Sequence, residues 1–367
     1  MRILPVTQLR FAISGVMLVG IVGCGGCNSG SNTGPGPGPT TTGGGGEVSA
    51  TTEEVLVGTA PVGGAFRQVG DALANVLNEN GGDNDWEIKS KGTKGSKQNI
   101  RELDSGDVRL AMANSAITYH AINGAADWDK EYEIRTVLTL AKNVGVFVAK
   151  EDSGIQTIAD LKGKRVAVGP AGAGFEIFLK PLLAEHGVTY EDFTPENQIY
   201  SDSVGALADG NIDAAFMGGA IPLPALSQAC STQSIRFISY DEEARLRLIE
   251  DTDKYPFLQD AMIPAKNSEG RATYAGMTDD FQAIDVGTTH LITTIDEDED
   301  LIYQITKTLW ENREQVGKQH AGTGDAISEA NAARFTGTPF HDGAIRFYKE
   351  IGIWQGDGSD ASADESE

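Results

Sequence analysis

Short apolar runs alternate with segments of helical period along residues 55–354. The first run, 55–57, is followed by a glycine-rich turn and then by apolar residues three or four positions apart, which predicts a strand, a turn and a helix. The unit recurs, predicting strands at 108–113, 165–169, 198–200 and 212–217, and helices around Ile100 and Leu103, at 175–186 and at 204–209. Such alternation predicts an α/β fold with mainly parallel sheets.

Two adjacent strand-like runs, 136–141 and 145–149, separate two such blocks, and a late run at 286–294 carries the chain back. This order predicts two α/β lobes joined by crossing strands, with hinges near 142–145 and 286–288. We expect residues 53–146 to form the first part of lobe 1, 147–285 to form lobe 2, and 286–354 to return to lobe 1 with the C-terminal helices. A ligand belongs in the cleft between the lobes, where strands end and helices begin.

The N-terminus indicates export. Residues 1–10 carry two arginines and no acid, and 11–22 form an apolar run too short to cross a bilayer. The run ends in Ile-Val-Gly-Cys, so 1–23 is interpreted as a lipoprotein signal peptide and Cys24 as its lipidation site; the alternative is an ordinary signal peptide with a chance cysteine. The protein is then expected to be periplasmic and lipid-anchored to the membrane.

Two flanking segments lack the residues for a core. Residues 24–52 are interpreted as a Gly/Pro/Thr-rich linker, and its uncharged part, 28–46, is expected to be mobile. Residues 355–367 are interpreted as an acidic disordered tail. The folded body is therefore expected to begin near Glu53.

Composition and charge narrow the function classes. The chain has 367 residues, 40% of them hydrophobic, which is typical of a globular protein. Its formal net charge of -24 makes nucleic acid a poor partner. Three cysteines cannot form a disulfide framework for a chain of this size, and Cys230 is alone in the folded body.

Two glycine-rich loops, 58–66 and 169–176, each follow a predicted strand and open a predicted helix. Their backbone N–H groups and the positive end of the helix behind them suit an anionic oxygen such as a carboxylate. The alternative is that both are tight strand-to-helix turns. Neither has the glycine order of a dinucleotide loop, and no mononucleotide loop occurs in the chain, so no cofactor is expected.

Catalytic and metal signatures are absent from the sequence. There is no G-x-S-x-G, no H-E-x-x-H, and no C-x-x-C apart from the pair that includes Cys24. The five histidines are scattered, and the acids at 296–300 fit a helix N-terminus better than a calcium loop. We therefore expect neither an enzyme nor a metal site.

A set of motifs in order resembles the TAXI family of solute receptors of tripartite ATP-independent periplasmic (TRAP) transporters. The resemblance covers about residues 53–354. It rests on the glycine loop with Phe66 and Gly70, on 95–106, on 152–166, on 169–172, on Gly210 with 213–216, and on His341 with the run 343–350. The set of matches in this order, including the closing run Gly-Ala-Ile-Arg-Phe-Tyr-Lys-Glu, makes the resemblance specific.

The resemblance implies a periplasmic-binding-protein fold of type II that captures a small organic acid or amino acid and delivers it to an ion-gradient-driven TRAP permease. Alternatives are a binding protein of an ABC importer or of a sensor kinase, or an exported α/β enzyme. The family usually has hydroxyl side chains where this chain has Pro61, Val62, Ala65 and Ala173, and often an Asp at Ala116. The pocket is therefore expected to be more apolar than usual.

The candidate ligand-binding residues come from the two glycine loops and from nearby strand ends. Asn99 and Ser96 have an alternative role in shaping the helix that follows them, and Phe66 has an alternative role in the core. Bulky substitution at Gly172 is expected to block backbone approach to the ligand. The full set is Thr59, Ala60, Gly63, Gly64, Phe66, Ser96, Asn99, Asn114, Ser115, Pro170, Ala171, Gly172, Ala173, Gly174 and Gly218.

Overall fold

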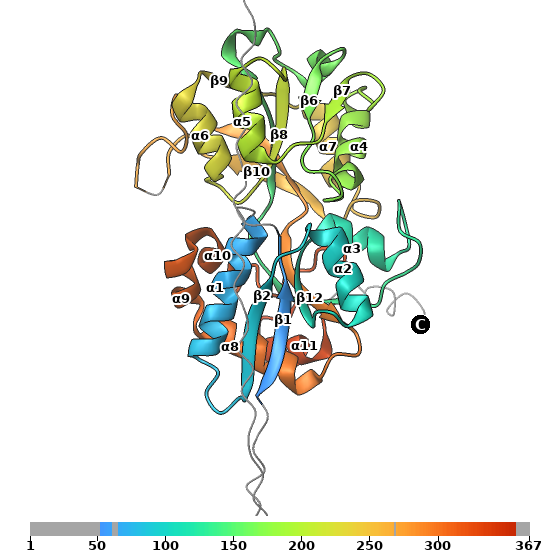
Figure 1. The fold of residues 1–367 in the computed structure, drawn as a ribbon, viewed down its shortest axis with the longest axis vertical. Helices are drawn as coiled ribbons and strands as arrows, with labels where there is room; N and C mark the ends of the chain where they lie inside the picture. The colour runs from blue at the N-terminus through green and yellow to red at the C-terminus, as the bar shows by residue number, and fades with distance from the viewer. Residues whose placement is uncertain (1–51, 61–64, 268, 357–367) are drawn as a thin grey trace, which may run out of the picture. The chain divides into compact units, whose positions relative to one another are not determined.

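Two β-sheets organise the chain (Figure 1). The structure, a computed structural model, describes residues 52–60, 65–267 and 269–356. These residues belong to one unit, Ala50–Glu367. The signal peptide, Cys24, the linker stretch 28–46, Gly63, Gly64 and the acidic tail from residue 357 lie outside the described residues.

The first sheet, which with its helices is called lobe 1, has five strands in the order β2-β1-β3-β12-β4. β1 pairs in parallel with β2 and β3, whereas β12 runs antiparallel to β3 and β4. Every residue of β3 is buried, as expected for a central strand covered on both faces. The strands are β1 (Glu53–Gly58), β2 (Trp86–Lys91), β3 (Leu110–Asn114), β4 (Ile134–Thr139) and β12 (Thr289–Thr294).

Helices of lobe 1 come from both ends of the chain. α1 buries Val69, Leu73, Val76 and Leu77 in one core with residues of α8 and α11, because these apolar positions recur every three or four residues. The helices are α1 (Ala65–Glu79), α2 (Ser96–Ser105), α3 (Ser115–Ile122), α8 (Glu299–Glu311), α9 (Arg313–Gln319), α10 (Ala321–Ala326) and α11 (Asp342–Glu350).

The second sheet, which with its helices is called lobe 2, has the strand order β10-β11-β5-β8-β6-β7, with β9 paired to β5. β5 is antiparallel to β8, β9 and β11, and only the β6 pairs are parallel. The strands are β5 (Val144–Lys150), β6 (Arg165–Ala167), β7 (Thr194–Glu196), β8 (Ala214–Gly219), β9 (Ile235–Ile238), β10 (Leu258–Ile263) and β11 (Phe281–Val286).

Lobe 2 carries its own helices and apolar cores. Thr157 and Asp160 form a capping pair at the start of η2, where the Asp160 carboxylate accepts from the backbone N–H of Thr157 at 2.9 Å. The helices are η1 (Glu151–Ser153), η2 (Ile158–Leu161), α4 (Glu176–Glu185), α5 (Tyr200–Ala208), α6 (Pro224–Thr232) and α7 (Glu242–Glu250).

The chain crosses between the lobes twice, at 140–143 from β4 to β5 and at Gly287 and Thr288 from β11 to β12. The two connections are hydrogen-bonded to each other: the Val286 backbone N–H donates to the Asn143 carbonyl and the Leu140 N–H to the Thr289 carbonyl, at 2.9 and 2.8 Å. The chain therefore has the two-lobed α/β fold that the sequence predicts.

Three sequence predictions are wrong in detail. Six of the ten strand pairs are antiparallel, so the sheets are mixed and not mainly parallel, because the connections bring β5, β11 and β12 back against the parallel sets. Residues 198–200 are not a strand, since Tyr200, Val204 and Leu207 have the helical period of α5. The run 286–294 is two strands, broken at Gly287, whose φ is 111°.

Candidate functional site

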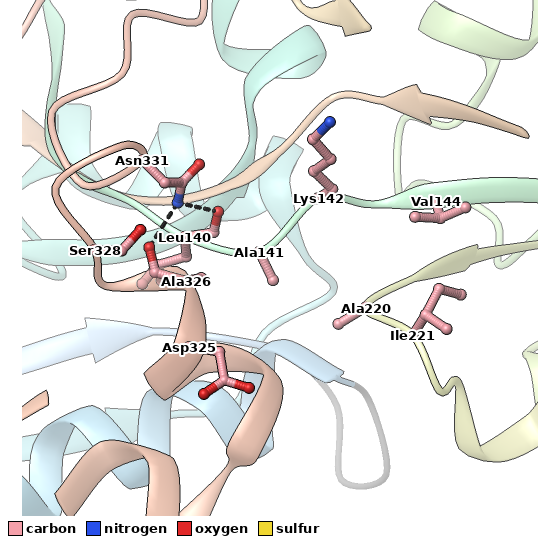
Figure 2. Close-up of a pocket in the computed structure, with 10 residues that line it drawn as sticks. All are labelled: Leu140, Ala141, Lys142, Val144, Ala220, Ile221, Asp325, Ala326, Ser328 and Asn331. Atoms are coloured by element: carbon pink, nitrogen blue, oxygen red, sulfur yellow. Dashed lines mark hydrogen bonds between the residues drawn. The ribbon is translucent and has the colours of Figure 1, made fainter. Parts of the chain in front are cut away.

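A cavity of about 310 Å³ lies where the two lobes meet at the first connection (Figure 2). Three segments far apart in sequence form it: the first connection with the start of β5, the turn after β8, and the end of α10 with the chain that follows it. Its volume is at the lower end of the range of small-molecule pockets. The lining residues are Leu140, Ala141, Lys142, Val144, Ala220, Ile221, Asp325, Ala326, Ser328 and Asn331.

The polar groups of this cavity differ in how many of their hydrogen-bonding positions are already used within the protein. The Asn331 amide nitrogen donates to the carbonyls of Leu140 and Ala326 at 2.9 and 2.7 Å (Figure 2), so it serves to hold the wall together. The Lys142 ammonium donates to the Asp260 carbonyl at 3.0 Å and keeps two further donors. Lys142 and Asp325 are exposed and point away from each other, so the charges lie at the cavity's edge.

Thr59 and Asn99, two predicted ligand residues, turn inward instead. Thr59 is fully buried, and its hydroxyl donates to the Lys91 carbonyl at 2.8 Å. Asn99 is also fully buried; its amide nitrogen donates to the carbonyls of Thr59 and Met112 at 2.8 and 2.7 Å, and its oxygen accepts from Thr93 at 2.6 Å. Asn99 lies inside α2 and does not cap it; it ties α2 to the ends of β1 and β3.

Three more of the predicted ligand residues, Ala60, Phe66 and Ser96, also pack within lobe 1. Ala60 is buried, and Phe66 is half-buried against the core that α1 shares with α8. Ser96 is buried, and its hydroxyl accepts from the Asn114 backbone N–H at 3.1 Å. The contact of Phe66 with this core fits the alternative role, in the core, that the sequence left open for this residue.

Asn114 and Ser115 join α3 to the second connection. The Asn114 side chain caps α3 by accepting from the Ala116 N–H at 2.9 Å, and it donates to the Gly287 carbonyl at 2.7 Å. The Ser115 backbone N–H donates to the Thr288 carbonyl at 2.9 Å. The buried Ser115 hydroxyl has no hydrogen-bond partner among the described residues.

The second glycine loop contacts lobe 1. A Cβ built at Gly174 would lie 3.1 Å from Ile117 in α3 and 3.3 Å from Lys97 in α2, so only glycine fits this approach without displacing a neighbour. Ala173 is buried, whereas Ala171 and Gly172 are exposed and Pro170 is partly exposed. A Cβ at Gly172 would meet no atom within 4 Å, although its φ of 78° disfavours other residues.

Gly218 lies in β8, where its backbone N–H donates to the Tyr200 hydroxyl at 3.0 Å. It precedes the cavity residue Ala220 by two positions. None of the predicted ligand residues lines the cavity itself. The residues that the sequence analysis missed, such as Asp325, Ser328 and Asn331, follow no strand and belong to no motif; only Lys142 carried a signal, as a predicted hinge residue.

Buried titratable groups lie beside the connections. His290 is fully buried and contacts the hydroxyls of Thr118 and Thr136 at 2.8 and 3.3 Å. Burial, aided by the charge of Arg334, lowers the pKa of His290 to about 3. Burial raises the pKa of Asp285 to about 6. His290 is therefore neutral at physiological pH, in a structural role.

Within 52–60, 65–267 and 269–356, no cluster of three His, Cys, Asp or Glu side chains is placed to hold a metal ion. In the same part of the chain, no helix combines the length and the apolarity needed to cross a membrane.

Several solved structures are similar to the chain at low sequence identity. The aliphatic sulphonate binding protein SsuA of Escherichia coli is 17% identical, with a TM-score of 0.41 over 75% of this chain and 81% of that protein. The alkanesulfonate-binding protein SsuA of Xanthomonas axonopodis pv. citri, bound to MOPS, is 14% identical, with a TM-score of 0.42 over 84% and 97%.

A third similar structure belongs to a study of glutathione import via GshT and the cystine ABC importer TcyBC of Streptococcus mutans. It is 12% identical, with a TM-score of 0.45 over 75% of this chain and 96% of that protein. The NMT1-like family matches residues 57–352. Because this match covers almost the whole described chain, the protein belongs to the NMT1-like family.

Proposed function

We propose that the protein is an extracytoplasmic receptor that captures a small solute between its lobes and delivers it to a membrane importer. The observation that carries this proposal is the cavity at the first connection, which is lined by residues of both lobes. A site in this place couples ligand contact to movement of the lobes, because the chain passes between them only at the two connections.

An organic acid or amino acid is the solute class that we favour. Lys142 is the cation among the lining residues, and two of its ammonium donors have no partner in the described chain. Most other lining side chains are apolar or small. No catalytic role is proposed for any of them.

A TRAP permease is the partner that the closing run 343–350 favours, through its resemblance to the TAXI family. An ABC importer is the alternative, because the Streptococcus mutans study names one. Uptake by cells distinguishes the two: a TRAP system stops when the ion gradient is collapsed, whereas an ABC importer stops when ATP is depleted. A lipid anchor at Cys24 would hold the receptor beside either partner.

Lobe boundaries are part of the proposal. The expected bounds 53–146, 147–285 and 286–354 shift by a few residues, because β5 begins at Val144 and β11 ends at Val286. We expect 53–139 with 289–354, and 144–286, to move as two bodies, with the hinge within 140–143 and at Gly287 and Thr288. The positions of β5 and β11 support placing the hinge a few residues before Val146 on the first crossing.

A thermal-shift screen tests the proposed function. The mature protein is heated with a panel of organic acids, amino acids and sulphonates, and a ligand that binds the native state raises the melting temperature. Ala220→Trp fills the cavity and is expected to abolish the shift, whereas Ala184→Trp, on the exposed side of α4, is expected to leave it unchanged. Equal shifts in both variants would exclude this cavity as the site.

A further inference from the structure

A closed ring of hydrogen bonds joins both lobe connections to the cavity wall. It begins at Asp285, at the end of β11, whose carboxylate accepts from two groups. One oxygen accepts from the Asn143 backbone N–H, in the first connection, at 3.0 Å. The other accepts from the Thr288 hydroxyl, in the second connection, at 2.6 Å. One carboxylate therefore ties the two connections together.

Arg334 continues the ring to the cavity. Its Nη2 donates to the Thr288 hydroxyl at 2.8 Å, and its Nε donates to the Asn331 side-chain oxygen at 3.0 Å. Asn331 lines the cavity and closes the ring by donating to the Leu140 carbonyl, in the first connection, at 2.9 Å. Arg334 itself is not a lining residue, so any effect on the cavity acts through Asn331.

The two charges in the ring are paired only indirectly. Asp285 and Thr288 are 0% and 1% exposed, and Arg334 is half-buried. Arg334 makes no ion pair within 4 Å in the described chain, and its Nη1 is buried without a partner there. The Thr288 hydroxyl is the group that links this guanidinium to Asp285. Removing the hydroxyl leaves a buried carboxylate and a half-buried guanidinium each short of a hydrogen bond, which costs more than losing a neutral pair.

Arg334 and Lys142, the two charged groups near Asp285, lower its pKa, whereas its burial raises it. Burial raises the pKa of Asp285 to about 6, against the lowering by the Thr288 hydrogen bond, by Arg334, by Lys142 and by the Asn143 N–H. Protonated Asp285 cannot accept on both oxygens as the carboxylate does, because one oxygen then carries the proton. Burial therefore favours the protonated form of Asp285, whereas the hydrogen bonds and nearby charges of the ring favour the carboxylate.

We infer that Asp285, Thr288 and Arg334 are positioning residues that clamp the two lobe connections and fix the Asn331 wall of the cavity. The clamp goes beyond the proposed function, since it concerns how the lobes are held and needs no ligand to be observed. If packing alone held the two connections together, their stability would not depend on the Thr288 hydroxyl. The clamp predicts that it does, and this makes the clamp testable.

Hydrogen exchange followed by mass spectrometry tests the clamp in the full chain without ligand. The variants are Thr288→Val, which removes the hydroxyl at nearly constant shape, and Thr288→Ser, which restores it. Thr293→Val is the matched control, because Thr293 is fully buried in β12, the strand that follows Thr288, and donates its hydroxyl to one backbone carbonyl, that of Arg109, at 2.7 Å. Arg334→Lys is a second perturbation that keeps the charge but cannot reach both Thr288 and Asn331.

The hydrogen-exchange rate at 140–143 and 286–289 is expected to rise about tenfold in Thr288→Val and in Arg334→Lys. In Thr288→Ser the rate is expected to lie within about twofold of the wild-type rate, and in Thr293→Val it is expected to equal the wild-type rate. Wild-type exchange in Thr288→Val, or an equal rise in Thr293→Val, would overturn the clamp. Because no ligand is used, a failed ligand screen would leave this result standing.

Discussion

Asn99→Ala tests whether a buried amide of lobe 1 acts as a structural tie or as a ligand contact. Asn99 makes three side-chain hydrogen bonds, to the carbonyls of Thr59 and Met112 and from the hydroxyl of Thr93, at 2.6–2.8 Å. Alanine removes all three and leaves a gap between α2 and the ends of β1 and β3. The fold is expected to lose stability although no cavity residue is touched.

The size of the loss follows from the number of bonds. At about 1 kcal/mol for each net hydrogen bond, the three bonds amount to about 3 kcal/mol. At roughly 2–4 °C for each kcal/mol, the melting temperature is expected to fall by about 6–12 °C, with the lower end more fitting for a chain of this length. Asn99→Asp is expected to be worse, because a buried carboxylate accepts only and cannot donate to the two carbonyls.

Urea unfolding followed by circular dichroism measures this loss as a shift of the midpoint at constant slope. Asn123→Ala is the control, since Asn123 is also an amide that donates to a backbone carbonyl, that of Tyr119 at 2.7 Å, but from an exposed position. The control is expected to lie within about 0.5 kcal/mol of the wild type. If Asn99→Ala is as stable as the control but no longer binds a ligand found in the thermal-shift screen, Asn99 is a ligand contact and the structural reading fails.

Three further predictions concern the lobes, pH and the anchor. Gly174→Val is expected to push loop 169–174 away from Ile117 and to increase the radius of gyration in scattering, whereas Gly172→Val, where a Cβ meets open space, should leave it unchanged; equal radii would contradict the lobe contact. The pKa of His290 is about 3 in the folded protein against an ordinary value of 6.5, so its contribution to stability is complete above pH 6.5 and is lost as the pH falls toward 3. The pKa of Asp285 is raised from 3.8 to about 6, so this group makes the fold more stable as the pH falls from about 6 to 3.8. His290→Gln should therefore lose less stability than the wild type between pH 7 and 4, and parallel curves would refute this. Cys24→Ala is expected to release the protein from the membrane fraction, and continued membrane binding would show that the anchor is misassigned.

The sequence predicted the elements well where a local rule decides them. Gly106 ends α2 in the left-handed conformation, and the acids before Leu301 start α8, with Asp298 as its N-cap. The points at which the chain crosses between the lobes were predicted from adjacent strand-like runs. The mixed sheet direction did not, because strand direction depends on where a chain returns and not on the residues of the strand.

The candidate site was harder to predict, because polar residues at strand ends have two uses. Thr59 and Asn99 look like ligand groups in a linear sequence, yet their side chains satisfy buried backbone carbonyls of lobe 1. The cavity joins Lys142, Ala220 and Asn331, which are up to about 190 residues apart and share no pattern. Only the tertiary fold brings them together.

The crystal structure of the protein with a ligand from the thermal-shift screen tests the central claim most directly. The account predicts that the ligand lies in the cavity formed by the first connection, the turn after β8 and residues 325–331, in contact with both lobes. A ligand bound wholly within one lobe, away from the connections, would contradict it.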